Sequence, residues 1–61
     1  MATAPTFSPI LVKRYARSRL YDTVALRYVS VEELRTWAAT GVPFVVIDAQ
    51  TAQDVTRVLL A

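Results

Sequence analysis

The spacing of apolar residues changes several times along the chain, and each change predicts a different element. A β-branched apolar run begins at Ile10 and leads into residues 13–15, which predicts a strand. Residues 26–29 predict a second strand. Residues 22–25 between them contain Asp and Thr, which can bond their own backbone and start a turn. A β-hairpin is therefore expected, although no Asn-Gly or Asp-Gly pair fixes its turn type.

Residues 30–41 carry the strongest helix signals. Ser30 and Glu33 form a capping box, in which the Ser30 hydroxyl accepts from the Glu33 N–H and the Glu33 side chain returns to the Ser30 N–H. Gly41 is a natural left-handed stop, and Pro43 prevents the helix from resuming. The sequence predicts a helix over residues 31–40. Its buried face, at three- and four-residue spacing, is expected to carry Val31, Leu34, Trp37 and Ala38.

The last third predicts one buried strand and a short helical turn. Residues 44–47 are continuously apolar up to Asp48, so they are expected to form a central strand or one covered by a partner. After a polar turn over residues 49–54, Thr56 could cap a short helix, with Val55 and Leu60 as a hydrophobic staple. Residues 1–9 are expected to be a flexible tail. The expected fold is a small α+β single domain over residues 10–61, with a basic N-terminal β-hairpin, one amphipathic helix, a buried strand and a short C-terminal helical turn.

The composition restricts how such a small domain can be stabilised. A chain of 61 residues forms at most one domain, and a core this small gives marginal stability. The chain contains no cysteine and no histidine, which removes disulfides and the commonest zinc ligands. Oligomerisation is the remaining aid, and a homodimer is its commonest form. Neither a membrane span nor a secretory signal is indicated, so a cytoplasmic protein is expected.

Charge is distributed unevenly between the two halves. Residues 1–30 hold five basic residues and one acidic residue, a net charge of +4, whereas residues 31–61 hold two basic and four acidic residues, a net charge of −2. If the first strand stays extended over residues 11–21, alternation divides its residues between two faces. One face carries Lys13, Tyr15, Arg17, Arg19 and Tyr21. The other face carries Ile10, Val12, Arg14, Ala16, Ser18 and Leu20.

A basic, aromatic face of this kind suits nucleic acid. Arg and Lys neutralise phosphates, and Arg can pair with guanine in the major groove, which a two-stranded ribbon can enter. The alternative is an edge strand that its charges keep soluble. A single bulge would change the register of the face.

The remaining conspicuous residues are expected to be structural. Asp22 is expected to fix the turn or orient a neighbouring Arg, and Tyr28 to pack across strands against Tyr21 or Leu20. Trp37 is expected in the core. Asp48 and Asp54 are expected to form turns and end the strand rather than bind a cation. Without His, Cys or a glycine-rich phosphate loop, the chain is not expected to be an enzyme or to hold a metal or cofactor.

Several ordered segments resemble one family, the polyhydroxyalkanoate (PHB/PHA) accumulation regulators. The matching segments are residues 12–15, 19–23, 27–35, 41–44, 46–49 and 54–57. The resemblance implies a bacterial transcriptional repressor domain that binds promoter DNA of granule-associated protein genes. It also implies association with the polymer granule, which releases the repressor from DNA. A DNA-binding role is carried over to Lys13, Arg14, Tyr15, Arg19, Tyr21 and Arg27, and the face argument adds Arg17.

The chain departs from the family pattern in two segments. Ala16 and Arg17 stand where a Pro-Asn pair is common, and Ala52 stands where a turn glycine is usual. Family members also usually continue into a further helical region. The function expected is sequence-specific binding of double-stranded promoter DNA by a dimeric repressor. The alternative is an interaction module that docks on a polymer granule, its coat proteins or another subunit, which the apolar residues 44–47 and 58–60 favour.

Overall fold

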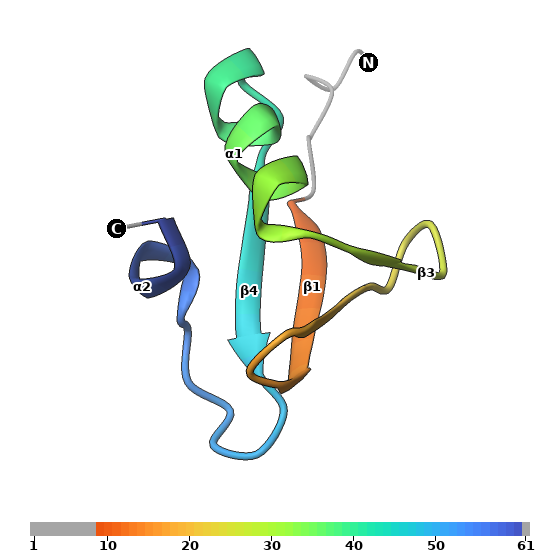
Figure 1. The fold of residues 1–61 in the computed structure, drawn as a ribbon, viewed down its shortest axis with the longest axis vertical. Helices are drawn as coiled ribbons and strands as arrows, with labels where there is room; N and C mark the ends of the chain where they lie inside the picture. The colour runs from red at the N-terminus through yellow and green to blue at the C-terminus, as the bar shows by residue number, and fades with distance from the viewer. Residues whose placement is uncertain (1–8, 61) are drawn as a thin grey trace, which may run out of the picture.

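The computed structural model describes residues 9–60, which form a four-stranded sheet and two helices (Figure 1). The N-terminal tail expected at residues 1–9 lies outside the described residues, apart from Pro9. The strand order is β3-β2-β1-β4, with β2 antiparallel to both neighbours and β4 parallel to β1. This confirms the small α+β fold. In chain order the elements are β1 (Ile10–Ala16), β2 (Arg19–Asp22), β3 (Arg27–Val29), α1 (Val31–Thr40), β4 (Phe44–Asp48) and α2 (Thr56–Leu60).

The basic segment forms two strands, so the condition that residues 11–21 stay extended as one strand is not met. The chain reverses at Arg17 and Ser18, between β1 and β2. The register shifts just before this turn: Arg14 pairs with Leu20, but Ala16 pairs with Arg19, which leaves Tyr15 as the extra residue. A bulge increases the local twist of a strand. The chain reverses at Arg17 and Ser18 although neither is the glycine or asparagine that usually marks a tight hairpin.

The turn predicted at residues 22–25 is present and connects β2 to β3. The Asp22 carboxylate accepts hydrogen bonds from the backbone N–H groups of Val24 (2.8 Å) and Ala25 (2.9 Å). The Asp22 carbonyl accepts from the N–H of Leu26 at 2.9 Å. Asp22 thus fixes the turn, as expected. Figure 1 shows this turn projecting from the body on the side away from α2.

One face of the sheet packs against α1 and against the residue that precedes α2. The sheet contributes one inward side chain from each strand, and α1 contributes Leu34, which is fully buried. Burying one such aliphatic side chain stabilises a fold by roughly 1.5–3 kcal/mol, so these few residues dominate the stability of this small domain. The core consists of Val12, Leu20, Val29, Leu34, Val46 and Val55.

Helix α1 has the predicted bounds and caps. The Ser30 hydroxyl accepts from the N–H of Glu33 at 3.1 Å. Gly41 adopts a left-handed conformation (φ 83°), and its N–H donates to the carbonyl of Trp37. Trp37 is half-buried beside the core, in edge-to-face contact with Phe44. Ala38 was expected to be buried but is exposed, because the last turn of α1 extends past the ends of the strands (Figure 1).

The outer edge of β4 is covered by the chain itself. The N–H of Asp48 donates to the carbonyl of Gln53, and the N–H of Val55 donates to the carbonyl of Val46, both at 2.8 Å. The Val46 N–H donates to the Thr56 hydroxyl at 2.8 Å. Thr56 was predicted to cap α2, but its hydroxyl instead accepts a hydrogen bond from β4.

Candidate nucleic-acid interface

The face of the sheet opposite the helices, called the open face below, is basic and aromatic. Strand residues that lie directly opposite each other point to the same face. Lys13 pairs with Tyr21, Tyr21 pairs with Tyr28, and Lys13 also pairs with Ile47 of β4. Within residues 9–60, the strand residues of this face include no acidic side chain. They are Leu11, Lys13, Tyr15, Arg19, Tyr21, Tyr28, Val45 and Ile47.

Three tyrosines form a continuous row across β1, β2 and β3. The ring centroids of Tyr15 and Tyr21 lie 6.4 Å apart, and those of Tyr21 and Tyr28 lie 5.1 Å apart, both in edge-to-face geometry. This geometry is favoured because the positive edge of one ring meets the negative face of the next. The expected packing of Tyr28 against Tyr21 is confirmed. Tyr15 and Tyr28, at the two ends of the row, are 49% and 57% exposed.

Three cations surround the tyrosine row. Lys13 and Arg19 lie on the open face, and Arg17 lies in the turn between β1 and β2. All three are exposed. None of their side chains makes a hydrogen bond or ion pair with another described residue. The two ion pairs within the described residues involve other arginines, Arg14 and Arg27. Their charges are therefore free to meet an external anion.

Arg14 is held in an ion pair with Asp48 at the ends of β1 and β4. Its Nε and Nη2 lie 3.0 and 2.7 Å from Asp48 Oδ2. The pKa of the Asp48 carboxyl lies below its ordinary value, because Arg14 and the N–H groups of Gln50 and Thr51 stabilise the carboxylate. Burial opposes this effect and raises the pKa. Asp48 thus ends the strand and forms the following turn, as predicted.

Arg27 also has an acidic partner. Its Nη2 lies 2.8 Å from Oε2 of Glu33, so the guanidinium joins β3 to the first turn of α1. The hydrogen bond from Arg27 lowers the pKa of Glu33, and the charge of Arg27 and the backbone N–H of Ser30 lower it further. Of the seven predicted site residues, Arg14 and Arg27 form ion pairs. Lys13, Tyr15, Arg19 and Tyr21 lie on the open face, and Arg17 lies in the turn between β1 and β2.

Two hollows of the described surface differ in charge. One, of about 360 Å³, lies at the end of the open face and is lined by Ser18, Arg19 and Tyr28. Sequence reasoning left Ser18 and Tyr28 out of the site, because neither a lone serine nor a cross-strand tyrosine carries a binding signal.

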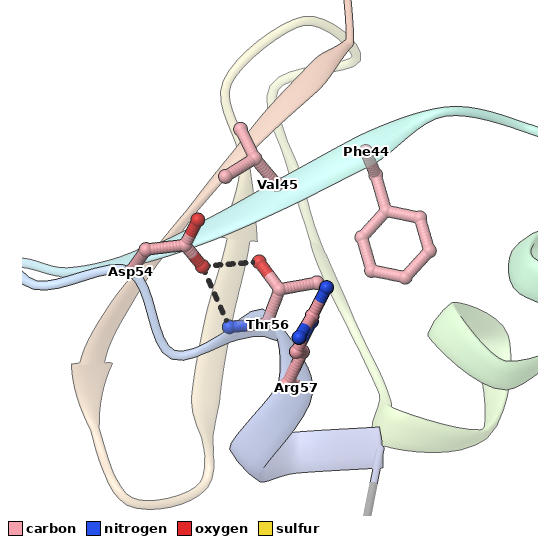
Figure 2. A pocket seen from close by; sticks show the side chains of 5 residues that line it. All are labelled: Phe44, Val45, Asp54, Thr56 and Arg57. Carbon is pink, nitrogen blue, oxygen red and sulfur yellow. Dashed lines mark hydrogen bonds between the residues drawn. The ribbon is translucent and has the colours of Figure 1, made fainter.

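The other hollow, of about 290 Å³, lies where the chain covers β4 (Figure 2). In it the Asp54 carboxylate accepts from the hydroxyl and the N–H of Thr56, at 2.6 and 2.9 Å, and these bonds lower the pKa of Asp54. The hollow is lined by one acidic side chain, Asp54, and one basic side chain, Arg57, so its lining carries no net charge. Asp54 forms the turn before α2, as predicted. The lining residues are Phe44, Val45, Asp54, Thr56 and Arg57.

The fold and the open face together define a small α+β domain with a basic, aromatic sheet surface, which is the chemistry of a nucleic-acid-binding module. The family model described as the PHB/PHA accumulation regulator DNA-binding domain matches residues 11–61. The chain belongs to this family, as the sequence resemblance predicted. The family is one of DNA-binding regulator domains and not of enzymes. In the described part of the chain, no helix is long and apolar enough to cross a membrane.

The curated relatives are considerably longer than this chain. A protein described as uncharacterized from Allochromatium vinosum is 38% identical over 50 residues, which cover 82% of this chain and 33% of the relative. A Thiocystis violacea protein, described as an uncharacterized protein in the phbA 5′ region, is 34% identical over 50 residues, or 82% of this chain and 36% of the relative. The chain thus spans about a third of the length of these relatives. No solved structure matches it.

Proposed function

We propose that this chain binds double-stranded promoter DNA in a sequence-specific manner, as the DNA-reading part of a dimeric transcriptional repressor of polyhydroxyalkanoate-synthesis and granule-associated genes. The observation that carries this proposal is the open face, where three cations without an acidic partner surround a row of three tyrosines. The description of the Thiocystis violacea relative, which places it in a phbA 5′ region, supports polyhydroxyalkanoate synthesis as the regulated process.

The seven proposed contact residues fall into three groups by their charge and their partners. Lys13, Arg17 and Arg19 would contact phosphates or guanine directly, because their charges are exposed and uncompensated. Tyr15 and Tyr21 would brace these long side chains. Arg14 and Arg27, whose charges are partly neutralised by Asp48 and Glu33, would mainly position β1 and β3. Their remaining N–H groups would add weaker contacts to the DNA. Docking of the sheet on a polymer granule is proposed only as a second role.

The alternative of a pure interaction module has less support than the apolar sequence pattern indicated, because part of that pattern packs in the domain's own core. Val46 of the apolar run is fully buried in the domain's own core, and Phe44 packs beside it. Leu59 and Leu60 of α2 also pack against this core, which leaves Val58 as the exposed member of the C-terminal apolar group. Val45 and Ile47, however, lie on the open face, so folding accounts for only part of the apolar residues that favoured the alternative.

A salt titration of DNA binding tests the proposal. The chain would be titrated with a promoter duplex of a polyhydroxyalkanoate-synthesis gene and with a scrambled duplex of equal length. If each of three cations neutralises one phosphate, log affinity should fall against log salt with a slope of about −2.7 per chain, and about twice that for a dimer. The Lys13→Ala, Arg17→Ala and Arg19→Ala triple variant should lose most of the slope. The control Arg35→Ala removes an exposed cation of α1 and should lose almost none.

A slope near zero for the unaltered chain would refute DNA binding as the function of the open face. Equal affinity for the promoter and scrambled duplexes would refute sequence specificity alone. Light scattering with and without the duplex measures the mass of the complex and so tests the dimer. Binding to granules with a flat salt dependence would favour the interaction module instead.

A further inference from the structure

The hollow lined by Ser18, Arg19 and Tyr28, called the rim hollow here, lies where the β1–β2 turn approaches β3. Tyr21 pairs with Tyr28, and Arg19 precedes Tyr21 by two residues, so Arg19 and Tyr28 are diagonal neighbours on the open face. Such neighbours lie about 7–8 Å apart at their Cα atoms, within reach of long side chains. Ser18 closes the hollow from the turn. Residues from two strands and a turn thus surround one space of about 360 Å³.

The lining groups of the rim hollow have the chemistry of an anion site. Arg19 carries a guanidinium, which donates hydrogen bonds and accepts none, and Ser18 and Tyr28 each carry a hydroxyl that can donate. None of these three side chains makes a hydrogen bond to another described residue, so their donors are unused. None of the three is acidic. A phosphate offers only acceptor oxygens, and Arg, Ser and Tyr are among the usual donors to DNA phosphates.

The tyrosine row holds Tyr28 in place before any ligand binds. Its ring lies at 74° to the ring of Tyr21, with the centroids 5.1 Å apart, although 57% of Tyr28 is exposed. An exposed side chain held by a neighbour loses less conformational freedom on binding than a free one. The Tyr28 hydroxyl is therefore partly positioned beside Arg19 without burial of the residue.

We propose that the rim hollow binds one phosphate of the DNA backbone, with Arg19 as the charged contact and Ser18 and Tyr28 as neutral hydrogen-bond donors. The proposal rests on the DNA-binding function proposed above, and it adds two residues that lie outside the basic and aromatic set assigned there. A phosphate contact carries no sequence information, but it fixes how the protein is placed along the duplex. The rim hollow would thus set the register in which Lys13 and Arg17 meet the DNA.

Removal of single hydroxyl groups tests this assignment. Tyr28→Phe keeps the ring that packs against Tyr21, and Ser18→Ala alters only an exposed turn residue. Each variant should weaken binding about tenfold or more, because the lost bond is to a charged group. The loss should be equal for promoter and scrambled duplexes, because a phosphate is the same in every sequence. The salt slope should stay unchanged, since no cation is removed. Arg19→Ala should instead reduce the slope by about one.

The matched control is Thr36→Val, which removes a hydroxyl from an exposed position of α1, on the covered side of the sheet. It should leave affinity for both duplexes unchanged. If Tyr28→Phe and Ser18→Ala weaken only promoter binding, the hollow reads a base, and the phosphate assignment is wrong. If both variants bind like the unaltered chain, whose own slope remains steep, the hollow is unused while the DNA-binding function stands. A flat slope for the unaltered chain refutes that function itself.

Discussion

Replacing Ala52 with glycine should stabilise the domain by about 0.5–1 kcal/mol. Ala52 has a φ of 61°, in the left-handed region, where a Cβ atom costs roughly 1–2 kcal/mol. Glycine removes this cost but adds about 0.5–1 kcal/mol of unfolded-state entropy, which leaves a net gain. The Ala52 side chain is exposed, so no buried contact is lost. The hydrogen bond from its N–H to the Asp48 carbonyl (2.7 Å) remains available to glycine.

Ala49→Gly provides a matched control in the same turn. Ala49 is also exposed, but it is not one of the positive-φ positions of the described chain, which are Leu26, Gly41 and Ala52. Glycine at residue 49 therefore adds unfolded-state entropy without relieving strain, and should destabilise the domain by about 0.5–1 kcal/mol. The two variants have the same composition, so only the local backbone conformation distinguishes them.

Thermal unfolding followed by circular dichroism measures both effects. In a domain of this size, 1 kcal/mol shifts the melting temperature Tm by about 4–8 °C. Ala52→Gly should therefore raise Tm by roughly 2–8 °C and Ala49→Gly should lower it by a similar amount. A fall in Tm for Ala52→Gly, or a shift of the same sign in both variants, would refute the argument from backbone strain.

Three further predictions concern the arginines, the helix cap and pH. Arg19→Ala should weaken DNA binding and leave Tm nearly unchanged, because Arg19 is exposed. Arg14→Ala should lower Tm by several degrees because it leaves Asp48 without its ion-pair partner. Equal shifts of Tm in the two variants would contradict this distinction. Gly41→Ala should lower stability by about 1 kcal/mol in denaturant unfolding, through its φ of 83° alone, since no atom would touch the new Cβ. The pKa values of Asp48 and Glu33 are lowered in the fold, so the unfolded chain binds more protons and stability is lost as pH falls below their ordinary values of 3.8 and 4.5. Tm measured between about pH 6 and pH 2 should fall on the acid side, and less steeply in Asp48→Asn; a flat profile would show that these ion pairs do not stabilise the fold.

The elements with local signals could be predicted from the sequence. Helix α1 was predicted with its true bounds because Ser30, Glu33 and Gly41 act within one turn of the helix ends. The turn at Asp22 was predicted for the same reason. The reversal between β1 and β2 was not, since Ser18 beside Arg17 is only a weak turn signal and the bulge at Tyr15 depends on pairing with β2.

Four of the five residues expected on the basic, aromatic face lie on it, although the segment forms two strands. Lys13 pairs with Tyr21, and both are odd-numbered, so folding the segment back on itself leaves the odd positions on a single face. Lys13, Tyr15, Arg19 and Tyr21 therefore share a face in the hairpin as they would in one strand, whereas Arg17 lies in the turn. The ion pairs could not be predicted in this way. Arg14 and Asp48 are 34 residues apart, and only the parallel pairing of β1 with β4 brings them together.

The tryptophan and the tyrosines lie on opposite sides of the sheet, so their fluorescence should report on two different processes. The single tryptophan, Trp37, contacts Phe44 beside the core on the helix side, with ring centroids 5.6 Å apart. All three tyrosines lie on the opposite side, in the row that would face DNA. Emission excited selectively in tryptophan should therefore follow unfolding, while quenching of tyrosine emission should follow ligand binding. One sample can thus yield the folding and binding signals separately, without an attached dye.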